Sequence, residues 1–149
     1  MEEPEQVISP QQAEEKVAAR YRVILILWIA ILTSVGVMFA LALLIPSSGS
    51  ANQTMNLALL GIGFMTVTTS LVLKQQMVKK AIETQQVSAL LNAYIIGFAL
   101  SESAAIFGLI DHFATGSGYY RFAFIMAAIG MLLHFPKKDH LRAVSFKRF

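Results

Sequence analysis

The chain has 149 residues, of which 56% are hydrophobic and 14% are charged, and its formal net charge is +3 at pH 7. Soluble domains carry about 25% charged residues, so this composition excludes a globule whose whole surface faces water. The chain has no cysteine, which excludes disulfides, thiolate metal sites and cysteine nucleophiles.

The apolar residues are concentrated in four long blocks rather than in periodic stripes. Because a helix needs about 17–25 residues to cross the hydrocarbon layer, we expect an all-α integral membrane bundle of four transmembrane helices. Their predicted ranges are residues 22–45, 54–73, 88–111 and 119–135. Buried core helices are the alternative, but the charged flanks argue against them. The first block is longer than the apolar part of a signal peptide, about 7–15 residues, so we expect it to be retained.

The segments between the blocks predict how the helices are connected. A helix should begin near Pro10 and continue into the first block. The short, breaker-rich turn at residues 46–53 predicts that the first two helices form an antiparallel hairpin. Residues 74–88 are polar but lack Gly and Pro, which favours helix beyond the membrane. Pro136 should end the fourth helix. The predicted organisation is a cytoplasmic N-terminal tail, a transmembrane domain and a basic cytoplasmic tail, at residues 1–21, 22–136 and 137–149.

Basic residues lie mainly on one side of the predicted bundle. They precede the first block, fill the second loop and follow the fourth block, at Lys16, Arg20, Arg22, Lys74, Lys79, Lys80, Lys137, Lys138, Arg142, Lys147 and Arg148. The other two loops hold only Arg121. This asymmetry predicts that both termini are cytoplasmic, with the protein in the cell's inner or plasma membrane. His134, at the inner boundary, is expected to be an interface anchor.

Every fourth residue along one stripe of the third block is small. The stripe consists of Ala89, Ala93, Gly97, Ser101 and Ala105. Small residues at this spacing let helix backbones approach closely in lipid. The stripe should therefore face protein. Packing within the bundle is the simpler explanation, and an oligomer interface is the alternative.

Glu102 is the one acidic residue in the middle of an apolar block. An ionised carboxylate at the bilayer centre costs about 2.5–3.5 kcal/mol. The cost falls when the carboxyl is protonated, hydrogen-bonded or bound to a cation. Hydroxyl groups that can support such a site are predicted at Ser101, Ser103, Thr66 and Thr69. These residues and Glu102 form the predicted binding set for a proton or a sodium ion.

The segment ALSESAAIFGL, residues 99–109, resembles the carboxylate helix of the rotor-ring proteolipid, the c-subunit of rotary ATP synthases. The matching residues are Ala99, Leu100, Glu102, Ile106, Phe107, Gly108 and Leu109. The resemblance implies that Glu102 carries the ion and that Ser103 helps to hold it, as in sodium-binding variants. The chain is not a plain c-subunit. Its second helix has few glycines, its polar loop has no Pro or Arg, and the four-helix family members carry the carboxylate in their fourth helix.

The sequence shows no pattern typical of catalysis, such as a phosphate-binding loop, a nucleophile elbow or a paired-histidine metal motif. We therefore expect no enzyme activity, no metal site and no nucleic-acid partner. Two functions stay open. In the first, Glu102 reversibly binds a proton or sodium ion in a homo-oligomer or with other membrane subunits. In the second, the chain is a non-transporting structural or accessory subunit, in which neutral Glu102 hydrogen-bonds between helices. The lipid bilayer is the surrounding partner in both.

Overall fold

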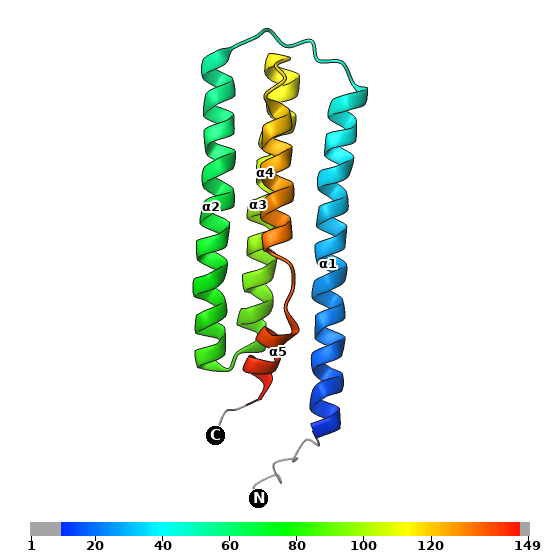
Figure 1. Cartoon of the computed structure of the whole chain (residues 1–149), viewed down its shortest axis with the longest axis vertical. Helices are drawn as coiled ribbons and strands as arrows, with labels where there is room; N and C mark the ends of the chain where they lie inside the picture. The colour runs from blue at the N-terminus through cyan, green and yellow to red at the C-terminus, as the bar shows by residue number, and fades with distance from the viewer. Residues whose placement is uncertain (1–9, 147–149) are drawn as a thin grey trace, which may run out of the picture.

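The computed structural model describes residues 10–146, and within them the chain folds into five helices (Figure 1). Their bounds are α1 Pro10–Leu44, α2 Gln53–Thr84, α3 Val87–Thr115, α4 Tyr120–Leu133 and α5 Lys138–Ser145. The predicted all-α class is confirmed. The acidic start of the N-terminal tail, residues 1–9, and the last three residues of the basic tail lie outside the described residues.

Three of these helices, α1, α2 and α3, are long and apolar enough to cross a membrane. Their outer faces carry large apolar side chains that nothing in the described part of the chain covers. Ile26 on α1 is 64% exposed and Met65 on α2 is 65% exposed. A soluble monomer rarely exposes so wide an apolar surface, so the structure supports a transmembrane protein.

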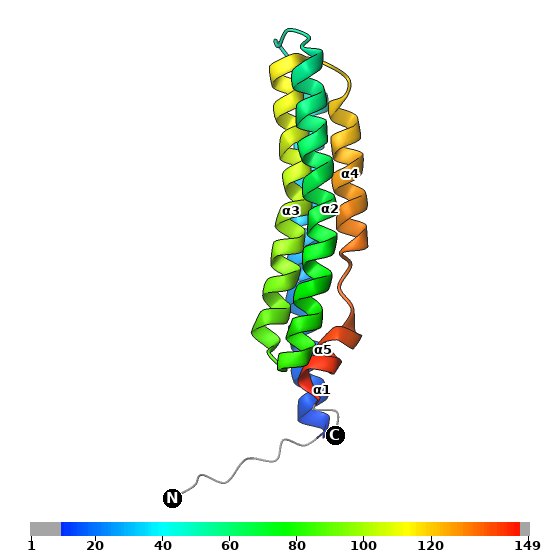
Figure 2. The ribbon, with the colours of Figure 1, turned by 90° about the vertical axis from the view of Figure 1, so that its left-hand side faces the viewer.

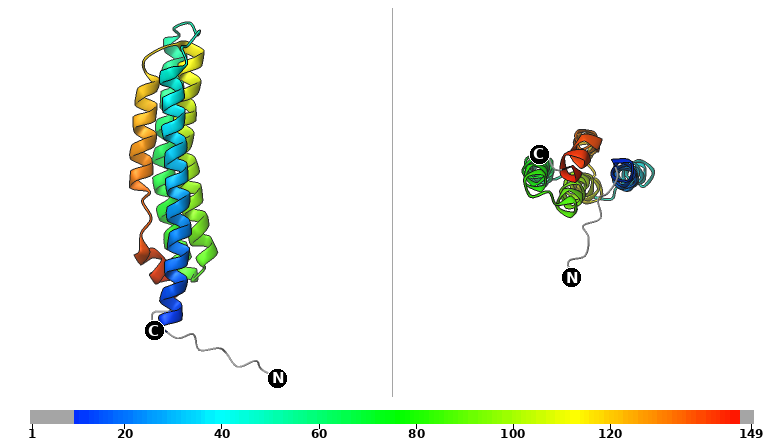
Figure 3. Two further views of the ribbon diagram at one scale, coloured as in Figure 1. Left: turned by 90° about the vertical axis from the view of Figure 1, so that its right-hand side faces the viewer. Right: turned by 90° about the horizontal axis from the view of Figure 1, so that it is seen from below.

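The chain runs as α1 and α2 on opposite sides, with α3 and α4 between them (Figure 3). The predicted antiparallel hairpin of α1 and α2 does not pack as a pair: the two helices are antiparallel, but none of their described Cα atoms approach within 8 Å of each other. α3 is the central helix, since it contacts each of the other four. The loop from α1 to α2 reaches across the end of α3, where Gly49 lies against the backbone of Ala114 and Thr115. A side chain at Gly49 would collide with that backbone.

The prediction that residues 74–88 favour helix is confirmed for nearly all of that segment. α2 continues through Thr84, and α3 begins at Val87 after a two-residue turn. Gln85 adopts the left-handed conformation with φ 54° and closes α2. The start of α1, this turn and α5 lie at one end of the bundle (Figure 1). We call this end the basic end and the opposite one the distal end.

α4 has 14 residues and ends at Leu133, earlier than the predicted 119–135. It covers about 21 Å, and an extended linker leads from it to α5 (Figure 2). Two side chains satisfy backbone groups there. The indole Nε1–H of Trp28 donates to the carbonyl of Met131 at 2.7 Å, and the N–H of Lys137 donates to the Tyr94 hydroxyl at 3.1 Å. Pro136 follows the end of α4, as expected.

The basic tail folds into α5, which the sequence did not predict. Its apolar side chains Leu141 and Val144 are buried in a cluster with Ile24, Tyr94 and Met131. A second buried cluster lies nearer the distal end and joins α1, α3 and α4. α5 thus covers the basic end of the bundle with an apolar face, while its polar face stays exposed.

Candidate functional site

Glu102 lies near the middle of α3, 15 residues after Val87, or about 22 Å along the helix. Its side chain is partly buried at the edge of the packed face, beside the fully buried Ser101. Within residues 10–146, Glu102 makes no hydrogen bond and no ion pair. The carboxyl is therefore at mid-depth of an apolar helix and has no polar partner in the described chain.

The predicted hydroxyl groups do not converge on Glu102. Ser103 Oγ donates to the Leu100 carbonyl of its own helix at 2.7 Å, and Thr66 Oγ1 donates to the Gly63 carbonyl at 2.9 Å. Both bonds run along a helix rather than across to a neighbouring one. Each hydroxyl proton is already engaged locally.

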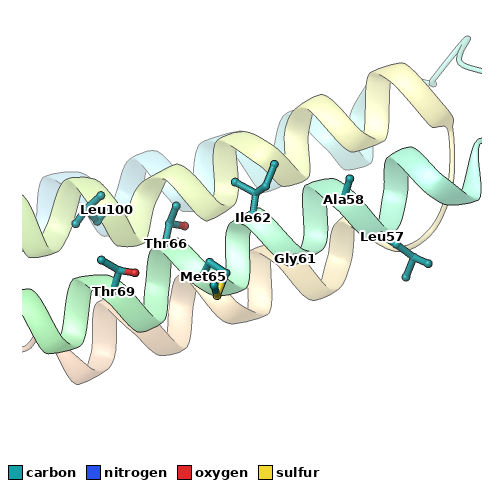
Figure 4. Close-up of a pocket in the computed structure, with 8 residues that line it drawn as sticks. All are labelled: Leu57, Ala58, Gly61, Ile62, Met65, Thr66, Thr69 and Leu100. Carbon is teal, nitrogen blue, oxygen red and sulfur yellow. The ribbon is translucent and has the colours of Figure 1, made fainter.

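Thr66 and Thr69 are brought together in a groove of about 480 Å³ on the surface of α2, with Leu100 of α3 at its edge (Figure 4). Glu102 is two residues beyond Leu100, which is about 200° around the helix. The carboxyl therefore belongs to the other side of α3. The structure unites the two threonines in this groove and places Glu102 apart from them.

Ser101 belongs to a buried hydrogen-bonded chain that the sequence did not reveal. Its Oγ lies 3.2 Å from Ser70 Oγ, and His134 Nε2 lies 2.9 Å from the same Ser70 atom. Ser70 has one hydroxyl proton, which it donates to the Val67 carbonyl at 2.6 Å. Ser70 must then accept from both partners, so Ser101 O–H and His134 Nε2–H are the donors. In the neutral ring Nδ1 is then a bare acceptor, and it has no partner among the described residues.

The expectation that His134 anchors at the interface is wrong, because its side chain is fully buried. Gly97 has no side chain, and this leaves room for the His134 ring. A Cβ there would lie 3.1 Å from two atoms of His134. Four members of the small-residue stripe, Ala93, Gly97, Ser101 and Ala105, are buried within the chain, and Ala89 is partly buried. The stripe gives α3 the room to receive α2, α4 and the residue that follows α4.

A second polar group lies beside this chain at the basic end. Lys74, buried one turn after Ser70, places its Nζ 4.5 Å from the centre of the Tyr94 ring. The Tyr94 hydroxyl lies 2.8 Å from His140 Nδ1 of α5. Burial lowers the pKa of His140 below its usual value near 6.5, and the charges of Lys74 and Lys137 lower it further against an opposing effect of Asp139. Neutral His140 can accept the phenolic proton at Nδ1.

We call these six residues the interhelical polar cluster: Ser70, Lys74, Tyr94, Ser101, His134 and His140. They come from α2, α3, α5 and the linker that follows α4, and their hydrogen bonds cross between elements that are far apart in the sequence. No described group of three or more His, Asp or Glu side chains is placed to hold a metal. The arrangement ties helices together and has no nucleophile–base–acid series. A Ser and a Lys four residues apart on α2 were the only signal for it in the sequence.

The distal end holds a separate polar cluster around Asp111. The Thr115 hydroxyl proton is shared between the Asp111 backbone carbonyl at 2.8 Å and the Asp111 carboxylate at 3.1 Å, and Ser117 Oγ donates to the carboxylate at 3.3 Å. His112 Nε2 lies 2.8 Å from the Ile45 carbonyl at the end of α1, so Nε2 is the donor. These bonds close the end of α3 and hold the α1–α2 loop against it, which accounts for the burial of both residues.

The chain matches no protein-family model, no curated protein and no solved structure.

Proposed function

We propose that this chain is a multi-pass membrane protein in which Glu102 binds and releases a proton at a contact with another copy or another membrane subunit. One observation carries the proposal: the carboxyl lies at mid-depth of α3, at the edge of the packed face, with no partner in the described chain. Intramembrane carboxylates are functional candidates by default. In this proposal the chain is not an enzyme and takes no cofactor besides the ion.

The free-energy cost of an ionised carboxylate in lipid explains how Glu102 would bind and release a proton. Against lipid, the ionised form is disfavoured by about 2.5–3.5 kcal/mol, so contact with lipid favours the protonated form of the Glu102 carboxyl. A neighbouring subunit that presents a cation or water lowers this cost and lets the proton leave. The resemblance of residues 99–109 to the proteolipid carboxylate helix supports the same role.

A proton fits the site better than sodium. Hard cations take several oxygen ligands at once. Thr66 and Thr69 line the groove on α2, on the other side of α3 from Glu102, and Ser101 is buried against Ser70. A single chain therefore offers no set of oxygens around Glu102, whereas a proton needs only the carboxyl.

We also propose four membrane crossings with both termini cytoplasmic. The helix α4 covers about 21 Å and residues 135–137 add about 10 Å, which together match the hydrocarbon layer of about 30 Å. Non-helical backbone at membrane depth requires protein cover, and His134 and Pro136 are buried. The basic end holds Lys74, Lys79 and Lys80 as well as α5, so the positive-inside rule assigns it to the cytoplasm.

The alternative is a non-transporting structural or accessory subunit. That function calls for Glu102 to hydrogen-bond between helices, yet the interhelical bonds of the described chain are made by other residues, such as Ser70, Ser101 and His134. A structural role for Glu102 would therefore require a bond to a second chain. The two functions differ in whether the carboxyl exchanges its proton.

The test is labelling with an apolar carbodiimide, which attacks a protonated carboxyl in an apolar setting. The protein in lipid vesicles is labelled across a pH series, with and without sodium, and each carboxyl is read by mass spectrometry. We expect labelling of Glu102 that falls as pH rises, is unaffected by sodium and is lost in Glu102→Gln. Glu83, exposed on α2, is the internal control for a water-facing carboxyl. Protection of Glu102 from labelling by sodium would mean that the site binds sodium rather than a proton. No labelling at any pH would favour the structural subunit.

A further inference from the structure

A groove of about 540 Å³ lies between α1 and α4 in the distal half of the bundle. Leu32, Gly36 and Phe39 line it from α1, and Ile125 and Ala128 line it from α4. All of these side chains are apolar. The remaining feature of the groove is a single charged residue at one end.

Arg121 is that residue, in the first turn of α4 at the distal end. It is exposed, and the described chain offers it no carboxylate. The one described interaction of its side chain is with the ring of Tyr120, whose centre lies 5.8 Å from the guanidinium carbon. The positive end of the α4 dipole lies at the same place. The groove is therefore apolar along its length and has a positive charge, without a described carboxylate partner, at its distal end.

We propose that the groove between α1 and α4 holds an acyl chain of one anionic phospholipid whose phosphate pairs with Arg121. The charge at the mouth complements a phosphate, and a guanidinium binds phosphate with several N–H donors. From Arg121 to Ala128 the groove follows α4 for about 10 Å toward the middle of the bundle, which is the direction an acyl chain takes from its headgroup. The proposal does not depend on proton binding at Glu102.

The groove on α2 provides an internal comparison. It has a similar size and is lined by apolar residues and two threonines, with no charged residue. Acyl chains can lie in it, but nothing there selects a headgroup. Selection of an anionic lipid should therefore depend on the groove that contains Arg121.

Two glycines allow each groove to be filled separately. A Cβ added at Gly36 or at Gly61 would meet no atom within 4 Å. Gly36 lines the groove beside Arg121, and Gly61 lines the groove on α2. Gly36→Leu should fill part of the first groove, with its Cβ clear of the walls, and Gly61→Leu is the matched control. Arg121→Gln removes the charge alone.

Trp28 reports on lipid contact, because it is the only tryptophan and lies one turn from Leu32 on α1. The protein is placed in phosphatidylcholine vesicles with increasing amounts of brominated phosphatidylglycerol or, separately, of brominated phosphatidylcholine. Bromine in the acyl chain quenches the tryptophan fluorescence on contact. We expect half-maximal quenching at an about fivefold lower mole fraction of the anionic lipid, as for one basic residue near an anionic headgroup.

The variants decide between a selective groove and ordinary surrounding lipid. Arg121→Gln should abolish the preference for the anionic lipid, Gly36→Leu should strongly reduce it, and Gly61→Leu should retain it. Equal quenching by the two lipids in the unaltered protein would overturn the proposal, as would a preference that survives Arg121→Gln. If Gly36→Leu and Gly61→Leu lost the preference for the anionic lipid equally, the lipid would not be bound in the groove between α1 and α4.

Discussion

The docking of α5 is expected to depend on Leu141. α5 has eight residues, and isolated helices shorter than about 12–15 residues are marginal in water, so packing must hold it in place. Leu141 is fully buried and Val144 is nearly so. A bond from Gln85 Nε2 to the Ala143 carbonyl, 3.1 Å long, adds one polar contact. We predict that Leu141→Ala releases α5 from the bundle.

The expected size of this effect follows from the burial of Leu141. Truncating a buried leucine to alanine costs about 2–5 kcal/mol. Because α5 is joined to the other four described helices only through the linker after α4, it can leave without separating them, so the cost acts on its docking equilibrium. A loss of about 2 kcal/mol raises the undocked fraction about thirtyfold. The ion pair of Arg142 with Glu14, at 3.2 Å, cannot compensate, because both side chains are about half exposed (51% and 50%) and such pairs contribute about 0–1 kcal/mol.

Hydrogen exchange followed by mass spectrometry measures this equilibrium directly. In Leu141→Ala, amide exchange of residues 138–145 should rise at least about thirtyfold, while exchange in α3 stays unchanged. Arg142→Gln is the control and should raise exchange in α5 less than about fivefold. If Leu141→Ala exchanged like the unaltered protein, burial of Leu141 would not be what holds α5, and the reasoning would be refuted.

Three further predictions concern the residues that join the helices. Gly97→Ala should lower the free energy of unfolding by about 1–3 kcal/mol through overpacking against the His134 ring, and an unchanged Tm in detergent would contradict this. Trp28→Phe leaves the Met131 carbonyl without its indole donor and should cost about 0.5–1.5 kcal/mol, read in the same melting assay. The pKa of His140 is lowered in the folded chain, so the unfolded chain takes up the proton more readily. The docking of α5 should therefore weaken as pH falls below about 6.5. Exchange in α5, corrected for intrinsic rates, should show this weakening in the unaltered protein and not in His140→Gln.

Most of the helical elements could be predicted from the sequence. The start of α1 at Pro10, the continuation of α2 to Thr84 and the end of α4 before Pro136 all follow from local propensities and chain breakers. The role of Glu102 in binding a proton stays a prediction. The unusual position of Glu102 could be recognised from the sequence, because it is a single carboxyl within an apolar block.

The partners of each helix could not be predicted. The apolar blocks are hydrophobic nearly all round, because lipid accepts the faces that protein does not cover. No amphipathic stripe therefore indicates which faces meet. A short α1–α2 loop favoured a hairpin, but the loop crosses the end of α3 and the two helices lie on opposite sides of the bundle.

The sequence by itself determined the helical class, the apolar lengths and the asymmetry of basic residues, because each depends on residue type and on neighbours within a few turns. Only the tertiary structure decided that His134 meets Ser70, that Trp28 supports the end of α4 and that α5 covers the basic end. Those contacts join residues that are 64 and 103 positions apart in the first two cases. They depend on where small residues let backbones approach, which packing in three dimensions determines and local sequence does not.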